Sequence, residues 1–503
     1  MAGFPAPKLL WLTRHEPAVL AAARHILLPK DYVRWRLTGE AASDRADASF
    51  WRASLRYSAR QDDGDMVSVT AFAGGDTTRS ALQVGPAAAH LGEDAITYGL
   101  RAAWRSEGDA AEAFAVPEIA VDAPLAGVAR VGRLVTGKPL LAGNRIVPLA
   151  DGDNAYPAML AAIDAARHSV TLLTYIFHND ATGNAFVSAL GAAHARGVQV
   201  RVLVDAVGLR YRPTGVQKRL KALGIPCAAF LPPGVTRLLS QVNLRNHRKI
   251  LVVDGEIGFT GGMNLSAHHW LATQPAAPVR CLHFEVRGPV VTDMQRTFAT
   301  DWAFTTGERL GGAPWFALPV SSGPVLARGV TDGPDADIDH MRQVILGALA
   351  GARERVRIVT PYFLPDEVLL STLQTTALRG VEVDIVLPVK SNLPLMDWAM
   401  RPQCDELVAA GCRIHLSPAP FDHAKLLVVD GAWALIGSTN WDARSLRLNF
   451  EYNLECHDAE LVRALEPLIA ARIAAATPLD AAALARQRLP ARLRNRLVWL
   501  LSP

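Results

Sequence analysis

A short motif with a histidine and a lysine, two side chains that can take part in catalysis, occurs twice in this chain. The first copy places His247 and Lys249 two residues apart, and the second places His423 and Lys425 in the same way. Residues two apart on an extended strand project to the same face, so each copy presents an imidazole beside an ammonium. An imidazole acts as a nucleophile or as a general acid, and a lysine neutralises the oxygens of a phosphate as charge builds up. Such chemistry needs no metal, and we expect no cofactor.

The two copies agree beyond the His-x-Lys pair. The shared positions are His247, Lys249, Asp254, Gly261 and Asn264 in the first copy and His423, Lys425, Asp430, Gly437 and Asn440 in the second. A single His-x-Lys is usually a pair of solvated strand or turn residues. A second copy in a matching frame reverses that expectation and favours one site to which both copies contribute.

Each motif is predicted to continue into a buried β-hairpin. Apolar, mostly β-branched or aliphatic runs follow the lysines at 250–253 and 426–429, and a second apolar run returns after an Asp-Gly pair. Asp254 and Asp430 belong to the motif and are counted with its catalytic residues, but each stands directly before the turn glycine. We therefore expect these two carboxylates to bind backbone or neighbouring side chains and not phosphate.

The repeat extends to whole domains. Residues 169–177 resemble residues 356–363, and we interpret Tyr175 and Tyr362 as equivalent; each run is followed by a glycine-capped helix and a second buried strand. Strand, helix, strand and hairpin form an α/β pattern with a sheet covered by helices. We place the two domains at 125–318 and 319–478.

The motif residues resemble those of the phospholipase D superfamily and, within it, the bacterial cardiolipin synthases. The resemblance rests on residues 246–254, 259–264 and 438–451, of which the last run is the most characteristic of the subfamily. It implies an α/β fold of two homologous phospholipase D-type α/β/α sandwich domains, with one active site at their interface. It also implies transfer of a phosphatidyl group through a phosphatidyl-histidine intermediate.

The resemblance assigns a role to each motif residue. We expect His247 to be the nucleophile and His423 the acid and base, with Lys249 and Lys425 on the phosphate oxygens. Further hydrogen bonds to the phosphate are expected from Asn264, Ser438 and Asn440.

Each imidazole also needs an acceptor that fixes its tautomer and orientation. The candidates are Glu285 and Glu451, which follow the first and second histidine on short strand-like runs. His268 and His269 lie just past the first motif; they could border the site, but we favour their interpretation as ordinary loop residues.

Composition limits the class of protein. The formal net charge is only +4, so the whole chain is not an electrostatic binder of nucleic acid. The five cysteines form no Cys-x-x-Cys pair, which argues against a disulfide framework or a zinc site and favours a reducing compartment. The sequence shows no transmembrane stretch or signal-peptide pattern, so we expect a peripheral protein on the cytoplasmic face of the membrane.

The resemblance implies an anionic phospholipid substrate, phosphatidylglycerol, and two basic segments agree with such a lipid at a membrane surface. Residues 206–246 contain seven basic side chains and no acid, and residues 481–503 contain five arginines and no acid. The tail at 479–503 is predicted to be an amphipathic membrane-surface helix; the alternative is a helix that packs on its own domain. Hydrolysis of phospholipid by water and a nuclease activity remain the alternative functions. We expect neither nucleic acid nor an obligate protein partner.

The N-terminal part does not belong to the repeat. Residues 5–50 resemble an internal fragment of xylulokinase-like sugar kinases, without an ATP-phosphate loop or enough chain for a kinase lobe. Residues 44–118 are polar and rich in alanine, which favours a poorly packed or partly disordered segment. We therefore expect residues 1–124 to be a non-catalytic extension.

Overall fold

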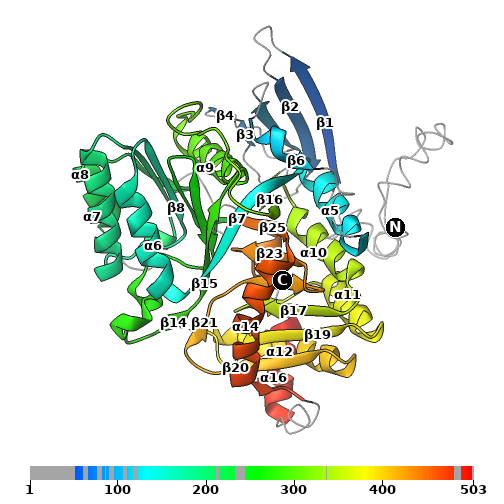
Figure 1. Cartoon of the computed structure of the whole chain (residues 1–503). Coiled ribbons are helices and arrows are strands. Elements are labelled where there is room, and N and C mark those ends of the chain that lie inside the picture. Colours follow the sequence, from blue (N-terminus) through cyan, green and yellow to red (C-terminus); the bar gives the residue numbers. More distant parts are fainter. Residues whose placement is uncertain are drawn as a thin grey trace, which may run out of the picture. The chain divides into compact units, whose positions relative to one another are not determined.

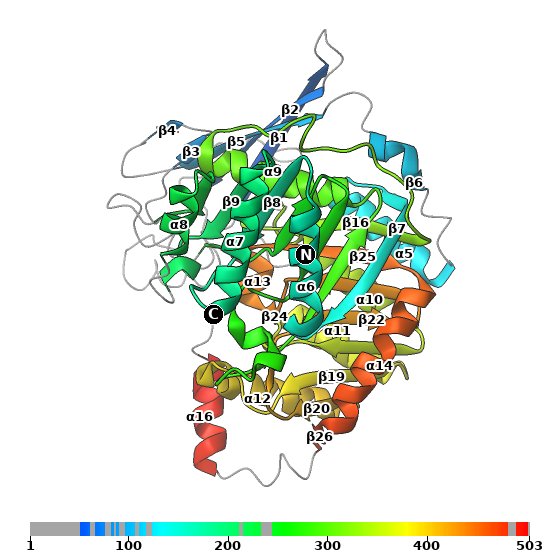
Figure 2. The same cartoon turned by 60° about the vertical axis from the view of Figure 1, so that its left-hand side comes forward.

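The computed structural model describes residues 51–60, 66–75, 82–84, 87–89, 96–105, 110–116, 123–210, 215–232, 244–335, 337–480 and 489–500. The chain divides into two compact units, Met1–Asp109 and Ala110–Pro503, which are described separately. Figures 1 and 2 show the fold from two directions. Both copies of the motif lie in the second unit.

The first unit contains an antiparallel sheet in the order β1–β2–β5 and a β3–β4 hairpin. The strands are β1 (Trp51–Arg60), β2 (Met66–Gly75), β3 (Leu82–Val84), β4 (Ala87–Ala89) and β5 (Ile96–Arg105). They fall within the 44–118 stretch that we expected to be poorly packed, but their side chains lie outside the described residues. The kinase-like fragment at 5–50 also lies outside them.

The first half of the second unit is a series of strands that pair in the order β10–β9–β8–β12–β13–β15–β7. Strands β8, β9 and β10 run parallel, and the others join antiparallel. Helices α6 to α8 cover one face of this series, and α9 covers the other (Figure 1). The strands are β7 (Leu140–Ala150), β8 (Ser169–Thr174), β9 (Gln199–Asp205), β10 (Cys227–Phe230), β12 (Ile250–Val253), β13 (Ile257–Gly261) and β15 (Leu282–Arg287); the helices are α6 (Asp151–Ala165), α7 (Ala181–Ala195), α8 (Val216–Ala222) and α9 (Val291–Thr306).

The second half repeats this arrangement in the order β16–β25–β23–β22–β17–β19–β20–β26. Its parallel strands are β17, β19 and β20. Helices α10 to α12 pack on one face and α14 on the other. The strands are β16 (Val325–Asp332), β17 (Arg355–Val359), β19 (Glu382–Pro388), β20 (Arg413–Ser417), β22 (Leu426–Val429), β23 (Trp433–Gly437), β25 (Asn449–His457) and β26 (Thr477–Pro478); the helices are α10 (His340–Gly351), α11 (Glu367–Leu378), α12 (Pro394–Ala409) and α14 (Ala459–Ala475).

The two halves join along β7 and β16, which pair antiparallel. Helices α9 and α14 bury apolar side chains in one shared hydrophobic cluster, in which Phe298 and Leu465 are fully buried. This shared core fixes the halves against each other, so the expected two homologous α/β/α domains with a common interface are confirmed. Short elements complete the unit: η1 (Ala110–Phe114), β6 (Ala115–Val116), α5 (Ala123–Thr136), η3 (Gly208–Arg210), β11 (Arg245–Asn246), η4 (Ala267–His269), η5 (Leu271–Thr273), β14 (Val279–Arg280), β18 (Phe363–Leu364), β21 (Phe421–Asp422), β24 (Trp441–Asp442), α13 (Ala443–Arg447) and α16 (Leu489–Leu500).

The two motif hairpins form as predicted. β12 pairs with β13 and β22 with β23, each through a turn at Asp-Gly. Asp254 and Asp430 both adopt a positive φ, of 53° and 49°. Aspartate tolerates this left-handed conformation better than most residues, which explains its place at the turn.

The two tyrosines, by contrast, are not equivalent in register. Thr174 and Thr360 make the same local hydrogen bond, to the carbonyl of Ile176 and of Tyr362 respectively. Tyr362 therefore corresponds to Ile176, and Tyr175 stands one position earlier. The error arose because both tyrosines follow a strand of similar composition.

Helix α16 packs against α12 near the C-terminus (Figure 2). The guanidinium of Arg494 lies 4.2 Å from the ring centre of Trp398 on α12. Within the described ranges, no helix has the length and apolar character needed to cross a lipid bilayer.

Candidate active site

The two motif histidines face each other across the interface of the halves. Their ring centres are 6.5 Å apart with the rings nearly perpendicular. His247 is 8% exposed and His423 is 9% exposed, so both are almost enclosed but reachable. The predicted convergence of the two motifs on one site is thus present in the geometry.

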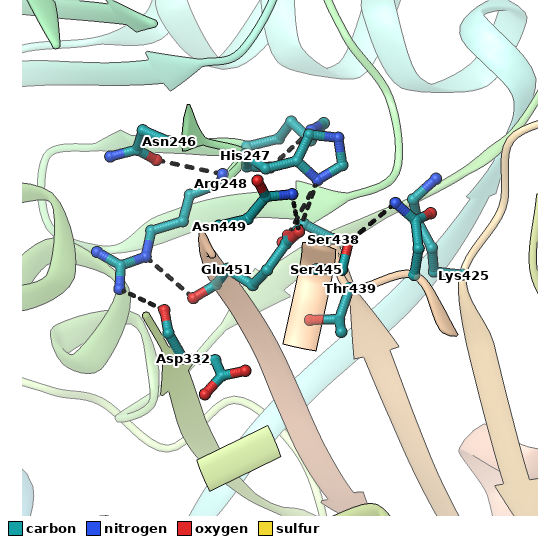
Figure 3. Close-up of polar contacts among 12 residues, drawn as sticks. Asn246, His247, Arg248, Asp332, Lys425, Ser438, Thr439, Ser445, Asn449 and Glu451 are labelled. Carbon is teal, nitrogen blue, oxygen red and sulfur yellow. Dashed lines mark hydrogen bonds and ion pairs between the residues drawn. The ribbon is translucent and has the colours of Figure 1, made fainter. Parts of the chain in front are cut away.

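His247 is held by a carboxylate from the other half. Its Nδ1 lies 3.0 Å from both Oε1 and Oε2 of Glu451, a fully buried residue on β25. Figure 3 shows that Asn449 and Ser438 converge on the same carboxylate, where their side chains donate hydrogen bonds. Burial lowers the pKa of His247 to about 4, although Glu451 opposes this shift. The free imidazole is therefore neutral near pH 7, and its Nε2 is left for chemistry.

The expected partner of each histidine needs correction. Glu451 was expected to serve the histidine of its own half, but it bonds His247 of the other half. Glu285 lies at neither histidine: it is half-buried and accepts a hydrogen bond from Arg287 at 2.7 Å. In strand register Glu285 corresponds to Glu455, a structural residue paired with buried Arg328. Glu285 does not orient a histidine here, because it lies four residues beyond the position that matches Glu451 in strand register.

His423 has a different environment. Its Nδ1 donates to the carbonyl oxygen of Gly262 at 2.9 Å. The rings of Tyr362, Phe421 and His269 surround it at 6.1 to 6.3 Å between ring centres. Burial, aided by nearby Lys425, holds the pKa of His423 well below its usual value. His269 thus borders the site, and its interpretation as an ordinary loop residue is wrong; His268 bonds the carbonyl of Ala277.

Both motif lysines are buried and bent toward their own histidine. The Nζ atoms of Lys249 and Lys425 donate to the backbone carbonyls of His247 and His423 at 2.6 and 2.7 Å. Lys249 also lies 5.4 Å from the ring centre of Tyr175. Burial lowers the pKa of Lys249 to about 7 and that of Lys425 to about 8. An anion bound between them would restore their full charge.

The affinity for an anionic phosphodiester is expected to fall as the pH rises through the pKa values of Lys249 and Lys425. Below about pH 7 both ammoniums carry charge, whereas above about pH 8 they lose protons and with them their attraction for phosphate. We expect KM for a soluble phosphodiester to rise about tenfold between about pH 6.5 and about pH 9. Steady-state kinetics across this range checks it, and a KM that stays flat would contradict the assignment.

The polar side chains expected on the phosphate divide into two groups. Ser438 has one hydroxyl proton and donates it to Glu451, which speaks against the expected contact with phosphate. Asn264 accepts a hydrogen bond from the backbone of Ile176, and Asn440 donates to Ser445. Both asparagines lie buried next to the motifs, and their contact with phosphate stays a prediction.

The motif aspartates tie each hairpin to the preceding strand. The carboxylate of Asp254 accepts hydrogen bonds from three successive backbone N–H groups, at residues 167–169, at 2.7 to 2.9 Å. Asp430 does the same with residues 353–355. Neither reaches the histidines, so the structural interpretation made from the turn position is the one that the geometry supports.

Replacing Asp254 with alanine is expected to lower the free energy of unfolding by about 2 to 4 kcal/mol. Three charge-assisted hydrogen bonds are lost, and alanine fits the left-handed turn less well. Denaturant unfolding of the full chain measures the change. Glu256→Ala, at an exposed position of the same turn, is the control and should change stability by less than about 0.5 kcal/mol. Equal stability of the two variants would contradict this role.

The sequence did not predict a network of hydrogen bonds that holds the backbone next to His247. Arg248 donates to Asp301 on α9 at 2.6 Å and to the backbone carbonyl of Glu451 at 3.0 Å, and Asn246 also donates to Asp301. These bonds fix the position of the backbone segment that carries His247. The sequence did contain a signal for this network: Asn246 and Arg248 flank His247, and on an extended segment their side chains point to the side opposite the histidine. Within the part of the chain that the structure describes, no group of His, Cys, Asp or Glu side chains is arranged to hold a metal.

Comparison with known families gives two matches along the chain. The family described as "Cardiolipin synthase, PLD-like domain" matches residues 159–302 and 345–472, which span both halves of the second unit. The family described as "FGGY family of carbohydrate kinases, N-terminal domain" matches residues 1–53, in agreement with the kinase resemblance.

Individual proteins agree with the first match. A cardiolipin synthase of Oceanobacillus iheyensis is 33% identical over 362 residues, which are 72% of this chain and 75% of that protein. A cardiolipin synthase A of Pseudomonas fluorescens is 34% identical over 394 residues, which are 78% of this chain and 81% of that protein. Among solved structures, the phosphatidylserine synthase of Haemophilus influenzae superposes with a TM-score of 0.59 at 14% identity, and covers 75% of this chain and 99% of its own. That last likeness bears on the fold alone.

Proposed function

Because this chain belongs to the cardiolipin synthase family of phospholipase D-like proteins, we propose that it moves a phosphatidyl group between lipids. The donor is phosphatidylglycerol, and the acceptor is the hydroxyl of a second phosphatidylglycerol or of another lipid alcohol. With phosphatidylglycerol as the acceptor, the products are cardiolipin and glycerol. The observation that carries the proposal is the pair of buried histidines at 6.5 Å, each with Nδ1 engaged and Nε2 free.

The donor step begins with attack of His247 Nε2 on the lipid phosphorus. The bond from phosphorus to the glycerol oxygen breaks, and His423, in its protonated form, gives its proton to that oxygen. The imidazole of His247 becomes positively charged on phosphorylation, and Glu451 at 3.0 Å stabilises that charge. Lys249 and Lys425 neutralise the non-bridging oxygens.

The acceptor step reverses these proton movements. His423 is now neutral and takes the proton of the incoming hydroxyl, whose oxygen attacks the phosphorus. The bond to His247 breaks, and both histidines return to their starting states. Water in place of the lipid alcohol would release phosphatidic acid, so exclusion of water decides between transfer and hydrolysis.

A lipid surface is the partner that best fits the C-terminal helix. On α16, Leu489, Leu493 and Leu497 are 68%, 60% and 58% exposed and lie on one face at helical spacing. Two arginines, at positions 492 and 496, stand beside them, whereas Arg494 stacks on Trp398 of α12. The helix packs on α12 and still turns its leucines outward, and this combination suits an interface with anionic lipid. As part of the proposal, the protein sits peripherally on the cytoplasmic face, where its five free cysteines stay reduced.

Replacing Leu493 and Leu497 together with serine is expected to weaken binding to phosphatidylglycerol vesicles at least about tenfold. Each leucine contributes on the order of 1.5 kcal/mol or more when its side chain enters the lipid. Vesicle co-sedimentation of the full chain measures the change. The control is the Leu318→Ser, Val320→Ser double variant, which alters two exposed apolar residues far along the chain from α16. Equal binding of both double variants to vesicles would remove α16 from the proposal.

Lipid product analysis tests the proposed function itself. Full-length protein is incubated with phosphatidylglycerol vesicles and, separately, with single-stranded DNA, and the products are identified by mass spectrometry. Cardiolipin and glycerol in equal amounts support the proposal. Phosphatidic acid as the main product would make the protein a hydrolase, and cleaved DNA would make it a nuclease. Either of these outcomes would overturn the proposal.

A further inference from the structure

Each motif histidine docks on a strand of the other half in the same way. The backbone N–H of His247 donates to the carbonyl of Phe450 at 2.9 Å, and that of His423 donates to the carbonyl of Arg280 at 2.7 Å. The residue after Phe450 is Glu451, the carboxylate that holds His247. The corresponding place for His423, one residue after Arg280, is occupied by a cysteine.

The strand registers give the same correspondence independently. Gly437 pairs with Asn453 in the second half, and Gly261 pairs with His283 in the first. Two residues before these partners stand Glu451 and Cys281. The repeat therefore places the Cys281 thiol where its own symmetry would put a carboxylate.

The groups that support the carboxylate are missing as well. Glu451 accepts hydrogen bonds from Ser438 and Asn449. In the first half, the counterpart of Ser438 is Gly262 and that of Asn449 is Val279, and neither has a side-chain donor. Three positions thus change together: a carboxylate with two side-chain donors is replaced by a glycine, a valine and a thiol that donates weakly to the carbonyl of Leu282 at 3.6 Å.

Cys281 is fully buried and packs against Gly262. A β-carbon at Gly262 would lie 2.8 Å from the Cys281 sulfur and 2.6 Å from the carbonyl oxygen of His423. These contacts leave room only for glycine, whose carbonyl then accepts the Nδ1 proton of His423. Burial raises the pKa of the Cys281 thiol to about 12, so the group is neutral.

We propose that Cys281 is a positioning residue that acts through Gly262: it leaves His423 on a neutral carbonyl and so makes it the weaker base of the two histidines. The inference rests on the proposed transfer at these two histidines. A weak base has a strong conjugate acid, which suits a group that must protonate a departing alkoxide. The thiol therefore gives the two halves unequal chemical roles despite their common fold.

The other charges around His423 act in the same direction. Lys425 follows His423 by two residues in the segment just before β22, Lys249 and His247 face it from the first motif, and His269 faces it from η4. Each of these groups carries or can carry a positive charge, and each therefore disfavours protonation of His423. The nearest acid along the chain, Asp422, is committed to Arg472 at 2.6 Å. A carboxylate at residue 281 would place a negative charge close to this histidine.

The test measures the titration of His423 directly. Full-length protein labelled with isotopes in histidine is titrated by NMR, and the His423 signal is assigned by its loss in His423→Asn. Cys281→Glu, which copies Glu451, is expected to raise the pH midpoint of His423 by at least about one unit, because an opposite charge moves within a few ångströms. Cys281→Asp is the second carboxylate variant, closer to cysteine in size. Cys281→Ser, which stays neutral, should shift the midpoint by less than about 0.3 unit.

The rate of the donor step gives a second readout. In a single turnover with phosphatidylglycerol, the decline in rate with rising pH should move upward by the same shift in the carboxylate variants. A midpoint of His423 that is equal in the folded carboxylate variants and in Cys281→Ser would overturn the inference. The NMR result does not depend on the substrate, so failure of this inference is distinguishable from failure of the proposed lipid transfer.

Discussion

His247→Asn is expected to abolish the covalent intermediate, whereas His423→Asn should slow its formation only when the leaving group is poor. An asparagine at residue 247 cannot form a bond to phosphorus, so the rate should fall by a factor on the order of 10⁴ or more for any donor. At residue 423 only proton transfer is lost, which costs a factor of about 10² to 10⁴ with a glycerol leaving group. A nitrophenolate needs no proton to depart, and with such a donor His423→Asn should lose less than about tenfold.

Rapid-quench experiments with phosphatidylglycerol and with a nitrophenyl phosphodiester measure both effects on the same preparations. His268→Asn is the matched control, since this histidine bonds a loop carbonyl and contacts neither motif lysine. The roles would be exchanged if His423→Asn abolished the intermediate with every donor and His247→Asn slowed the reaction only with the poor leaving group. We expect His247 to be the nucleophile because its Nδ1 bonds a carboxylate, whereas that of His423 bonds only a neutral carbonyl.

The residues within one strand or turn were predictable from the sequence. The hairpins follow from apolar runs closed by Asp-Gly, and Asp254 was expected to bind backbone. These features depend on neighbours along the chain, which periodicity and turn chemistry describe well. The His-x-Lys pairs themselves lie in the short segments just before β12 and β22 and not, as we expected, within a strand.

Contacts across the interface were not predictable in the same way. Glu285 and Glu451 were chosen because each follows its own histidine, but the pairing of β11 with β25 brings Glu451 to His247 instead. Ser438 was placed on phosphate because it lies in the motif, and its hydroxyl is instead used by Glu451. A single sequence shows which residues are repeated in the two halves. It does not show whether a repeated residue contacts its own half or the other one.

Glu451→Gln is expected to reduce turnover by a factor of about 10² to 10⁴. The carboxylate accepts from His247, Ser438 and Asn449, so all of its neighbours are donors. A glutamine has one accepting oxygen and one donating NH₂ group, and it cannot satisfy all three donors. If the NH₂ group faces His247, the imidazole must carry its proton on Nε2, where the lone pair needed for attack is then lost.

The pH dependence separates this tautomer effect from a simple change in basicity. Glu451 raises the pKa of His247 against the effect of burial, so its loss should move the acid limb of the pH profile to lower pH and leave more of the histidine neutral. The fraction of neutral His247 alone therefore predicts no loss of turnover near pH 7, whereas the wrong tautomer and the lost stabilisation of the charged intermediate predict a large loss at every pH. Glu285→Gln is the matched control, because Glu285 bonds only Arg287 among the described side chains and lies at neither histidine. A Glu451→Gln enzyme as active as this control would mean that the carboxylate orients nothing that the reaction needs.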